Sequence, residues 1–325
     1  MEEEVFEQRT DLSGLNQHMF AIRNEIGKVI IGQHKMLDLL LIGLLCDGHI
    51  LIEGVPGVAK TLTAKLIAKI IDVDFSRIQF TPDLMPSDVV GTSVFNPKEG
   101  DFYFKPGPVF SNIILIDEIN RAPAKTQAAL FEVMEERQVT VDGVTHQMRF
   151  PFIILATQNP IEQEGTYRLP EAQLDRFIFK IDVQYPSLQE EISILNSQHG
   201  NTQAVLLEQV NKIFSVSDIL KYRNLIQGIV VEPKLIDFIA RIVIETRNNP
   251  ALYLGASPRA SLAILKTAKA VAAIKGRDFV TPEDIIEMAA PVLRHRIILT
   301  PEKEMEGITP DELIETLLKG IEVPR

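Results

Sequence analysis

Cysteine, tryptophan and long hydrophobic runs are almost or wholly missing from this sequence. The single cysteine, Cys46, cannot form an internal disulfide, and its apolar neighbours suggest a small core residue. The longest apolar run, residues 39–46, is broken by Gly43 and is far shorter than the roughly 20 residues that a membrane-spanning helix needs. Acidic residues follow the first methionine where a secretory signal would be basic. We therefore expect a cytoplasmic protein that is not inserted in a membrane.

Positive charge is also in short supply. The chain has 33 Lys and Arg residues against 44 Asp and Glu residues, which gives a formal net charge of −11. Because general affinity for nucleic acid requires a dense cationic surface, we expect no nucleic-acid partner. The histidines are scattered without the paired spacing of a zinc site, so we predict no protein-ligated zinc.

Apolar sequence, by contrast, is plentiful. Hydrophobic residues make up 46% of the 325 positions, which is enough for two buried cores. In the first part of the chain, short apolar segments that favour β-strands alternate with helical patterns. The predicted strands are residues 49–53, 75–80, 113–117, 152–157 and 177–183. This alternation predicts an α/β protein with a parallel sheet between two layers of helices.

The strand pattern largely stops near residue 186, and helix signals replace it. Pairs of Ser-Pro or Thr-Pro recur at residues 257–258, 281–282 and 309–310, and these residue types are favoured at the first positions of helices. We therefore predict an α/β core in residues 1–186, which begins with helices, and a smaller all-α domain in residues 187–325.

Two additions to this core are predicted. An insert near residues 81–110 separates the second strand from the third, and Asp142-Gly143 between alternating Val and Thr residues predicts a β-hairpin near residues 137–150. The insert concentrates the aromatic residues Phe95, Phe102, Tyr103 and Phe104. Such residues either contact another protein or pack over the sheet, and the sequence leaves both alternatives open.

A glycine-rich loop directly follows the first predicted strand and precedes a helical pattern, which is the context that a phosphate-binding loop requires. The predicted nucleotide-binding residues here are Gly54, Val55, Pro56, Gly57, Val58, Ala59, Lys60, Thr61 and Leu62. Lys60 can reach the outer phosphates, and the Thr61 hydroxyl can ligate Mg²⁺. Ala59 stands where glycine normally precedes the lysine, so the loop geometry there needs inspection. A simple Gly/Pro turn with a solvated lysine is the alternative.

Two adjacent carboxylates end the third predicted strand. Parallel sheets bind ligands at the carboxyl ends of their strands, so Asp117 and Glu118 are expected to lie near the loop. Asp117 would support Mg²⁺ directly or through water, and Glu118 would deprotonate the water that attacks the terminal phosphate. Carboxylates at strand ends are common, and only their pairing with the loop makes this prediction specific.

These segments, with Ala156-Thr157-Gln158-Asn159-Pro160 after the next strand, resemble the AAA+ superfamily and, more narrowly, its MoxR branch. The resemblance implies that Asn159 is the sensor 1 residue. An amide suits that role because it can bind the attacking water and a phosphate oxygen together. An Asn-Pro turn that merely ends a strand is the alternative.

The resemblance also assigns roles to three arginines. Leu169-Pro170-Glu171-Ala172-Gln173-Leu174-Asp175-Arg176-Phe177 is similar to a MoxR signature and implies that Arg176 is an arginine finger that acts on a neighbouring subunit. Arg168 competes for that role, and an ion pair within the subunit is the alternative for Arg176. Arg259, in the segment after Gly255, resembles sensor 2 and is expected to contact nucleotide. An exposed arginine at the start of a helix is the alternative.

Membership of the MoxR branch would imply a ring-shaped ATPase, with a hexamer as the expected form, that binds ATP or ADP with Mg²⁺. It would also imply a chaperone-like role in remodelling, maturing or activating protein complexes, often beside a protein with a von Willebrand factor A domain. Three alternatives remain open at this point: a related ring motor such as a metal-chelatase subunit, a nucleotide-gated scaffold with little turnover, and a small-molecule P-loop kinase.

Overall fold

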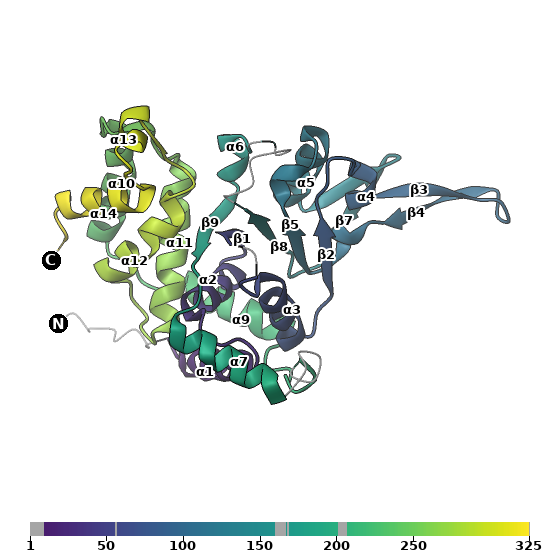
Figure 1. The fold of residues 1–325 in the computed structure, drawn as a ribbon, viewed down its shortest axis with the longest axis horizontal. Helices are drawn as coiled ribbons and strands as arrows, with labels where there is room; N and C mark the ends of the chain where they lie inside the picture. The colour runs from purple at the N-terminus through teal and green to yellow at the C-terminus, as the bar shows by residue number, and fades with distance from the viewer. Residues whose placement is uncertain (1–9, 56, 160–166, 168, 201–206, 325) are drawn as a thin grey trace, which may run out of the picture.

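The structure is a computed structural model, and it describes residues 10–55, 57–159, 167, 169–200 and 207–324. Five parallel strands form its central sheet in the order β2-β5-β8-β1-β9 (Figure 1). They are β1 (His49–Gly54), β2 (Phe75–Gln79), β5 (Ile113–Asp117), β8 (Ile153–Gln158) and β9 (Phe177–Val183). Each strand begins and ends within one residue of its predicted bounds, so the predicted parallel sheet is confirmed.

Helices cover both faces of this sheet, because alternate residues of each strand present apolar side chains to opposite faces. Ile50 and Ile52 of β1 join the hydrophobic cluster on one face, whereas Leu51 between them joins the cluster on the other. The first cluster contains α1 (Ser13–Gly27), α2 (His34–Leu45) and α3 (Lys60–Ile71). The second contains α4 (Pro86–Val90) and α5 (Ala124–Glu136). The three-layer α/β core is therefore confirmed.

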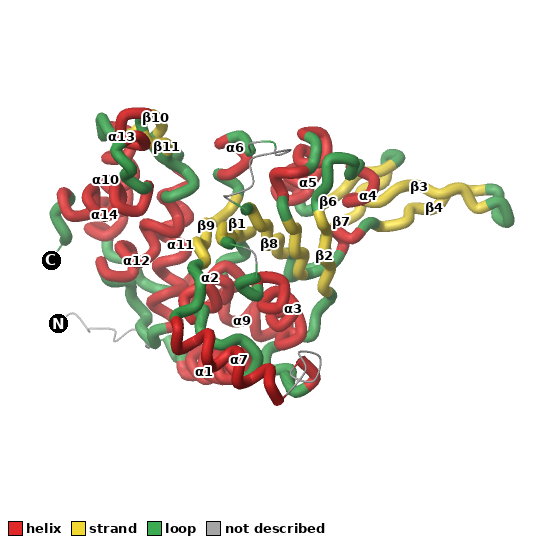
Figure 2. The backbone as a smooth tube through the Cα atoms, viewed as in Figure 1, coloured by secondary structure: helices red, strands yellow, loops and turns green. Residues whose placement is uncertain are grey.

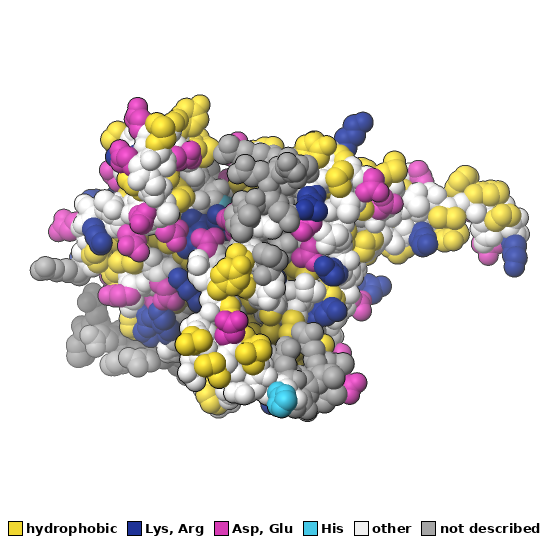
Figure 3. All heavy atoms as spheres, viewed as in Figure 1, with side chains coloured by type: hydrophobic (Ala, Val, Ile, Leu, Met, Phe, Trp, Pro, Cys, Tyr) yellow, Lys and Arg dark blue, Asp and Glu magenta, His cyan; other side chains and the backbone are white. Residues whose placement is uncertain are grey.

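Two antiparallel hairpins lie beyond the β2 edge of the sheet (Figure 2). β3 (Gly91–Asn96) pairs with β4 (Asp101–Pro106), and β6 (Gln138–Val141) pairs with β7 (Val144–Gln147). Asp142 and Gly143 both have positive φ, as a two-residue hairpin turn requires. The β3–β4 hairpin projects as an arm with hydrophobic side chains on its surface (Figure 3).

One short helix directly precedes β9, and a series of helices follows it. They are α6 (Glu171–Leu174), which precedes β9, then α7 (Leu188–Gly200), α9 (Val216–Gln227), α10 (Pro233–Asn248), α11 (Pro258–Ile274), α12 (Pro282–Leu293), α13 (Pro301–Met305) and α14 (Pro310–Gly320). The expected starts at Ser257, Thr281 and Thr309 are all N-caps followed by proline. Two short strands, β10 (Leu252–Leu254) and β11 (Ile298–Leu299), pair within this otherwise helical region.

Helix α9 packs on the core as well as against α11. α9 contacts α2, and the backbone N–H groups of Ile213 and Phe214 donate to the carbonyl of Ile70 at the end of α3. The helices α10 to α14 lie together beside the β9 edge (Figure 1), and α11 and α12 contact β9. A domain boundary near residue 186 remains a prediction. Within the described ranges, none of the helices combines the length and apolarity that crossing a bilayer demands.

Candidate functional site

A cavity of about 450 Å³ opens at the carboxyl ends of the central strands. It brings together most of the residues that the sequence predicted: Gly54, Gly57, Val58, Ala59, Lys60, Thr61, Leu62, Asp117, Glu118 and Asn159. Val55 packs against the hydrophobic core behind the loop. Pro56 and Arg168 lie outside the described residues. The loop, the carboxylate pair and the amide therefore share one site, although they come from three separate segments.

The loop that joins β1 to α3 relies on unusual backbone conformations. Gly54 has a φ of 155°, and a Cβ there would lie 2.7 Å from the carbonyl oxygen of Val183. Gly57 has a φ of 87° and faces open space. Ala59 has a φ of 58° and a ψ of 20°, so it is left-handed rather than helical. Its methyl group therefore costs about 1 kcal/mol of backbone strain that the usual glycine would avoid.

Lys60 begins α3 with its side chain turned back over the loop. Its Nζ donates to the carbonyl of Gly54 at 2.7 Å. Burial lowers the pKa of Lys60, while the charges of Asp117, Glu53 and Glu118 act to raise it. An ammonium group that faces carboxylates across a polar cavity is suited to binding a polyphosphate.

The carboxylate pair is held by residues from the two neighbouring strands. Arg77 of β2 donates from Nε to Asp117 Oδ2 at 2.6 Å, and Thr157 of β8 donates from Oγ1 to Asp117 Oδ1 at 3.2 Å. Gln79 donates from Nε2 to Glu118 Oε2 at 2.7 Å. Glu118 itself has a left-handed φ of 58°, which turns its side chain away from the strand direction.

Arg77 and Gln79 are functional candidates that sequence reasoning missed. Both line the same cavity, because β2 lies beside β5 with Gln79 opposite Asp117. A signal was present, since two polar residues at alternate positions of a strand must lie on one face. Their hydrogen bonds hold Asp117 and Glu118 in fixed positions.

The donor set of this cavity fits Mg²⁺ with a nucleotide. Thr61 offers a hydroxyl and Asp117 a carboxylate, and Mg²⁺ prefers oxygen ligands from one or two protein groups together with phosphates and water. The backbone N–H groups at the start of α3 add the positive end of a helix dipole. The arrangement can therefore bind a polyphosphate, neutralise its charge and present a carboxylate to water.

Arg176 and Arg259 do not line this cavity. Arg176 immediately precedes β9, and β9 runs parallel to β1, so Arg176 lies at the amino end of the sheet, one strand length from the loop. It donates to the carbonyl of Phe131 at 3.1 Å and forms an ion pair with Glu135. Arg259 Nη2 pairs with the same Glu135 at 2.7 Å. The two arginines therefore form their own cluster.

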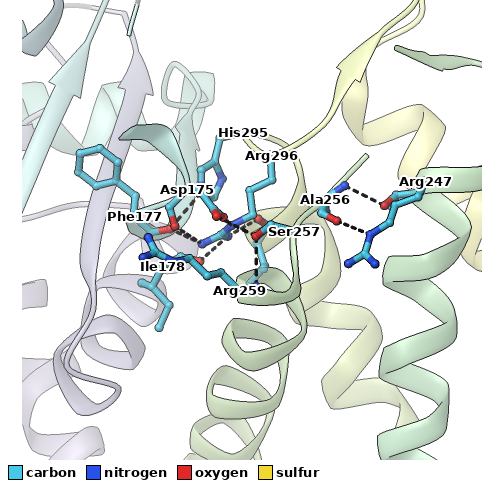
Figure 4. Close-up of polar contacts among 11 residues, drawn as sticks. Asp175, Phe177, Ile178, Arg247, Ala256, Ser257, Arg259, His295 and Arg296 are labelled. Atoms are coloured by element: carbon cyan, nitrogen blue, oxygen red, sulfur yellow. Dashed lines mark hydrogen bonds and ion pairs between the residues drawn. The ribbon is translucent and has the colours of Figure 1, made fainter. Parts of the chain in front are cut away.

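A network around Asp175 explains why Arg259 lies there. Ser257, the N-cap of α11, donates from Oγ to Asp175 Oδ2 at 2.7 Å, and Arg296 donates from Nε to Asp175 Oδ1 at the same distance (Figure 4). Arg296 also donates to the carbonyls of Phe177 and Ile178 in β9. The start of α11 is thereby fixed at the amino end of β9, far from the subunit's own loop.

The fold and the site define an AAA-type ATPase. Residues 49–179 match the family model described as "ATPase family associated with various cellular activities (AAA)", and residues 244–317 match the AAA lid domain. The chain is 45% identical over 299 residues to the uncharacterised protein YeaC of Bacillus subtilis strain 168, covering 92% of each.

Two further comparisons identify the family within the AAA ATPases. The chain is 44% identical over 310 residues to Chaperone MoxR1 of Mycobacterium tuberculosis, covering 93% of this chain and 81% of that protein. The crystal structure of a candidate ATPase from Cytophaga hutchinsonii has a TM-score of 0.88 and 45% identity, with 97% of each chain covered. The chain belongs to the MoxR family of AAA ATPases.

Proposed function

We propose that this protein is a Mg²⁺-dependent ATP hydrolase whose turnover drives chaperone-like remodelling, maturation or activation of protein complexes. The observation that supports it most directly is the single cavity shared by Lys60, Thr61, Asp117, Glu118 and Asn159. The proposal places ATP or ADP in this cavity, with the loop residues 54–62 around the phosphates.

Each residue of the cavity would have one role. Lys60 would bind the outer phosphates, and Thr61 and Asp117 would hold Mg²⁺, which neutralises charge on the phosphate oxygens. Glu118 would accept a proton from the attacking water, and Asn159 would orient that water. Because Gln79 binds Glu118, the position of the base would depend on β2.

Arg176 and Arg259 would act on the nucleotide of a neighbouring subunit. Both lie at the end of the sheet opposite the loop, so they could reach a phosphate only across an interface between copies. This arrangement supports a closed ring, with a hexamer as the proposed form, in which each active site is completed by the next subunit.

The remodelling part of the proposal rests on the β3–β4 arm. Phe102 is 65% exposed and packs on Phe95 with ring centroids 5.2 Å apart, whereas Phe104 stacks on His146 of β7 at 4.2 Å. The arm is thus braced against β7 and exposes the aromatic side chains of Phe95, Phe102 and Tyr103. A protein client would cover these aromatic side chains, and a von Willebrand factor A domain protein is the proposed class of partner.

The test is steady-state ATP hydrolysis with the solution mass recorded on the same samples. Wild type should hydrolyse ATP and exceed the 36.4 kDa of one chain, and Lys60→Ala should lose nucleotide binding. Assembly with ATP but without turnover would instead favour a nucleotide-gated scaffold. A monomer that transfers phosphate to a small acceptor would contradict the proposal.

A further inference from the structure

One carboxylate, Glu135 in the last turn of α5, joins the two arginines that the active cavity leaves out. Its Oε2 pairs with Arg176 Nη1, and its Oε1 accepts from Arg259 Nη2 at 2.7 Å. Arg176 belongs to the core, at the start of β9, whereas Arg259 begins the lid helix α11. A single side chain therefore holds together two guanidinium groups from different parts of the fold.

The pair of arginines needs a counter-ion. Burial and the nearby positive charge of Arg259 both lower the pKa of Arg176, which shows that the two guanidinium groups act on each other. Arg176 Nε is buried and has no hydrogen-bond partner. Guanidinium groups bind carboxylates and phosphates through the same planar geometry, so Glu135 occupies a position that suits a phosphate group.

We propose that Glu135 is a positioning residue that restrains Arg176 and Arg259 as a pair and is exchanged for the terminal phosphate of ATP bound in the neighbouring subunit. This inference rests on the proposed function, because it needs both arginines to face a neighbour. In a subunit without such a phosphate, Glu135 neutralises the pair. When the phosphate arrives, it takes over both arginines and Glu135 is released to solvent.

The exposure of the three side chains makes such an exchange practicable. Glu135 is 37% exposed, Arg176 28% and Arg259 51%, so the cluster faces solvent and is not locked inside a core. Ion pairs of this kind contribute between about 0 and 1 kcal/mol. A restraint of that size is easily displaced by a more highly charged phosphate, and it changes an apparent affinity by up to about fivefold.

The chain offers a matched control on the same helix. Glu136 is adjacent to Glu135 and lines the same cavity of about 540 Å³ beside the arginines. No ion pair joins Glu136 to Arg176 or Arg259 in the structure as described. Glu136→Gln therefore removes the same charge without touching the pair.

The experiment measures the ATP concentration that gives half-maximal hydrolysis and half-maximal assembly for wild type, Glu135→Gln and Glu136→Gln. Glutamine keeps an oxygen that can accept from the arginines but lacks the competing charge. We expect Glu135→Gln to lower both ATP concentrations by about two- to fivefold, and Glu136→Gln to leave them unchanged. With ADP, which has no terminal phosphate to exchange, assembly of Glu135→Gln should match wild type. In an Arg259→Ala background, Glu135→Gln should lower the required ATP concentration by a smaller factor.

Two results would overturn the inference while leaving the ATPase function intact. One is that Glu135→Gln and Glu136→Gln need the same ATP concentrations for half-maximal hydrolysis and assembly. The other is that Glu135→Gln needs more ATP than wild type, which would mean that Glu135 assists the arginines instead of competing for them. If Glu135→Gln does not fold, Glu135→Asp takes its place, because its carboxylate is one methylene shorter. This variant should lower the required ATP concentration by a smaller factor, and an unchanged ATP concentration would also overturn the inference. Absence of both turnover and assembly in wild type would mark failure of the proposed function itself.

Discussion

The two ends of the central sheet carry different kinds of functional group. At the carboxyl end, one cavity gathers a lysine, a hydroxyl and two carboxylates that are already held in place by neighbouring strands. At the amino end of β9, two arginines face a single glutamate and lie apart from that cavity. Under the proposed function, the first end would bind ATP, whereas the second would act on a phosphate that another copy supplies. The difference suggests that catalysis is divided between subunits.

Removing the arginine at the amino end should have the largest effect. Arg176→Ala should lower ATP turnover by roughly 10³-fold or more, because the arginine would stabilise charge that develops in the transition state. ATP binding should survive, since the cavity is untouched. Arg241→Ala, at an exposed arginine of α10, is the control and should keep full activity. Wild-type turnover in an Arg176→Ala monomer would show that the two ends work independently.

Removing the base at the carboxyl end should have the second-largest effect on turnover. Glu118→Gln should lower turnover by about 10²- to 10⁴-fold while ATP affinity stays near that of wild type, because the carboxylate would act only on water. Binding can be followed with a fluorescent ATP analogue alongside hydrolysis. Equal loss of binding and turnover would mean that Glu118 supports the nucleotide and is not the base.

Acid should destabilise the protein through a buried histidine at the amino end of the sheet. Burial lowers the pKa of His49 to about 4, and its Nδ1 accepts from the N–H of Ile154. Since the unfolded chain binds this proton more readily, the free energy of unfolding should fall by about 3 kcal/mol as the pH drops from about 6.5 to 4. Urea denaturation across this pH range measures it. A His49→Gln variant should be less stable at neutral pH but should lose part of this pH dependence; an unchanged slope would contradict the assignment.

The smallest effect concerns the loop itself. Ala59→Gly should relieve left-handed strain and change stability by about 1 kcal/mol or less, since the flexibility gained in the unfolded chain partly offsets the relief. Thermal unfolding without nucleotide is the measurement, and ATP turnover should remain within a few-fold of wild type. Loss of ATP binding would show that the alanine methyl is part of the phosphate site.

The contiguous parts of the carboxyl end could be predicted from the sequence. Lys60 and Thr61 follow a strand and open a helix, and Asp117 and Glu118 end another strand, so local pattern alone places them. The contact of Arg77 with Asp117 could not be predicted from local pattern, because it depends on the order of strands in the sheet. Sequence order does not reveal which strand becomes a neighbour.

The amino end was predicted far less completely. Arg176 and Arg259 were identified through resemblance, but their meeting at Glu135 depends on how α11 is fixed to β9 by Asp175 and Arg296. These contacts join segments more than 80 positions apart in the chain, and none of the residues has a local pattern that marks it. A buried polar network of this kind is specified by tertiary packing and is visible only in the structure.

The central claim is that each active site is shared between two subunits, and mixing the two inactive variants tests it most directly. Glu118→Gln supplies an intact Arg176 but no base, and Arg176→Ala supplies an intact base but no finger. An equal mixture should recover up to about a quarter of wild-type turnover, because a quarter of random interfaces would combine both intact groups. No recovery in mixed assemblies of confirmed mass would contradict the account.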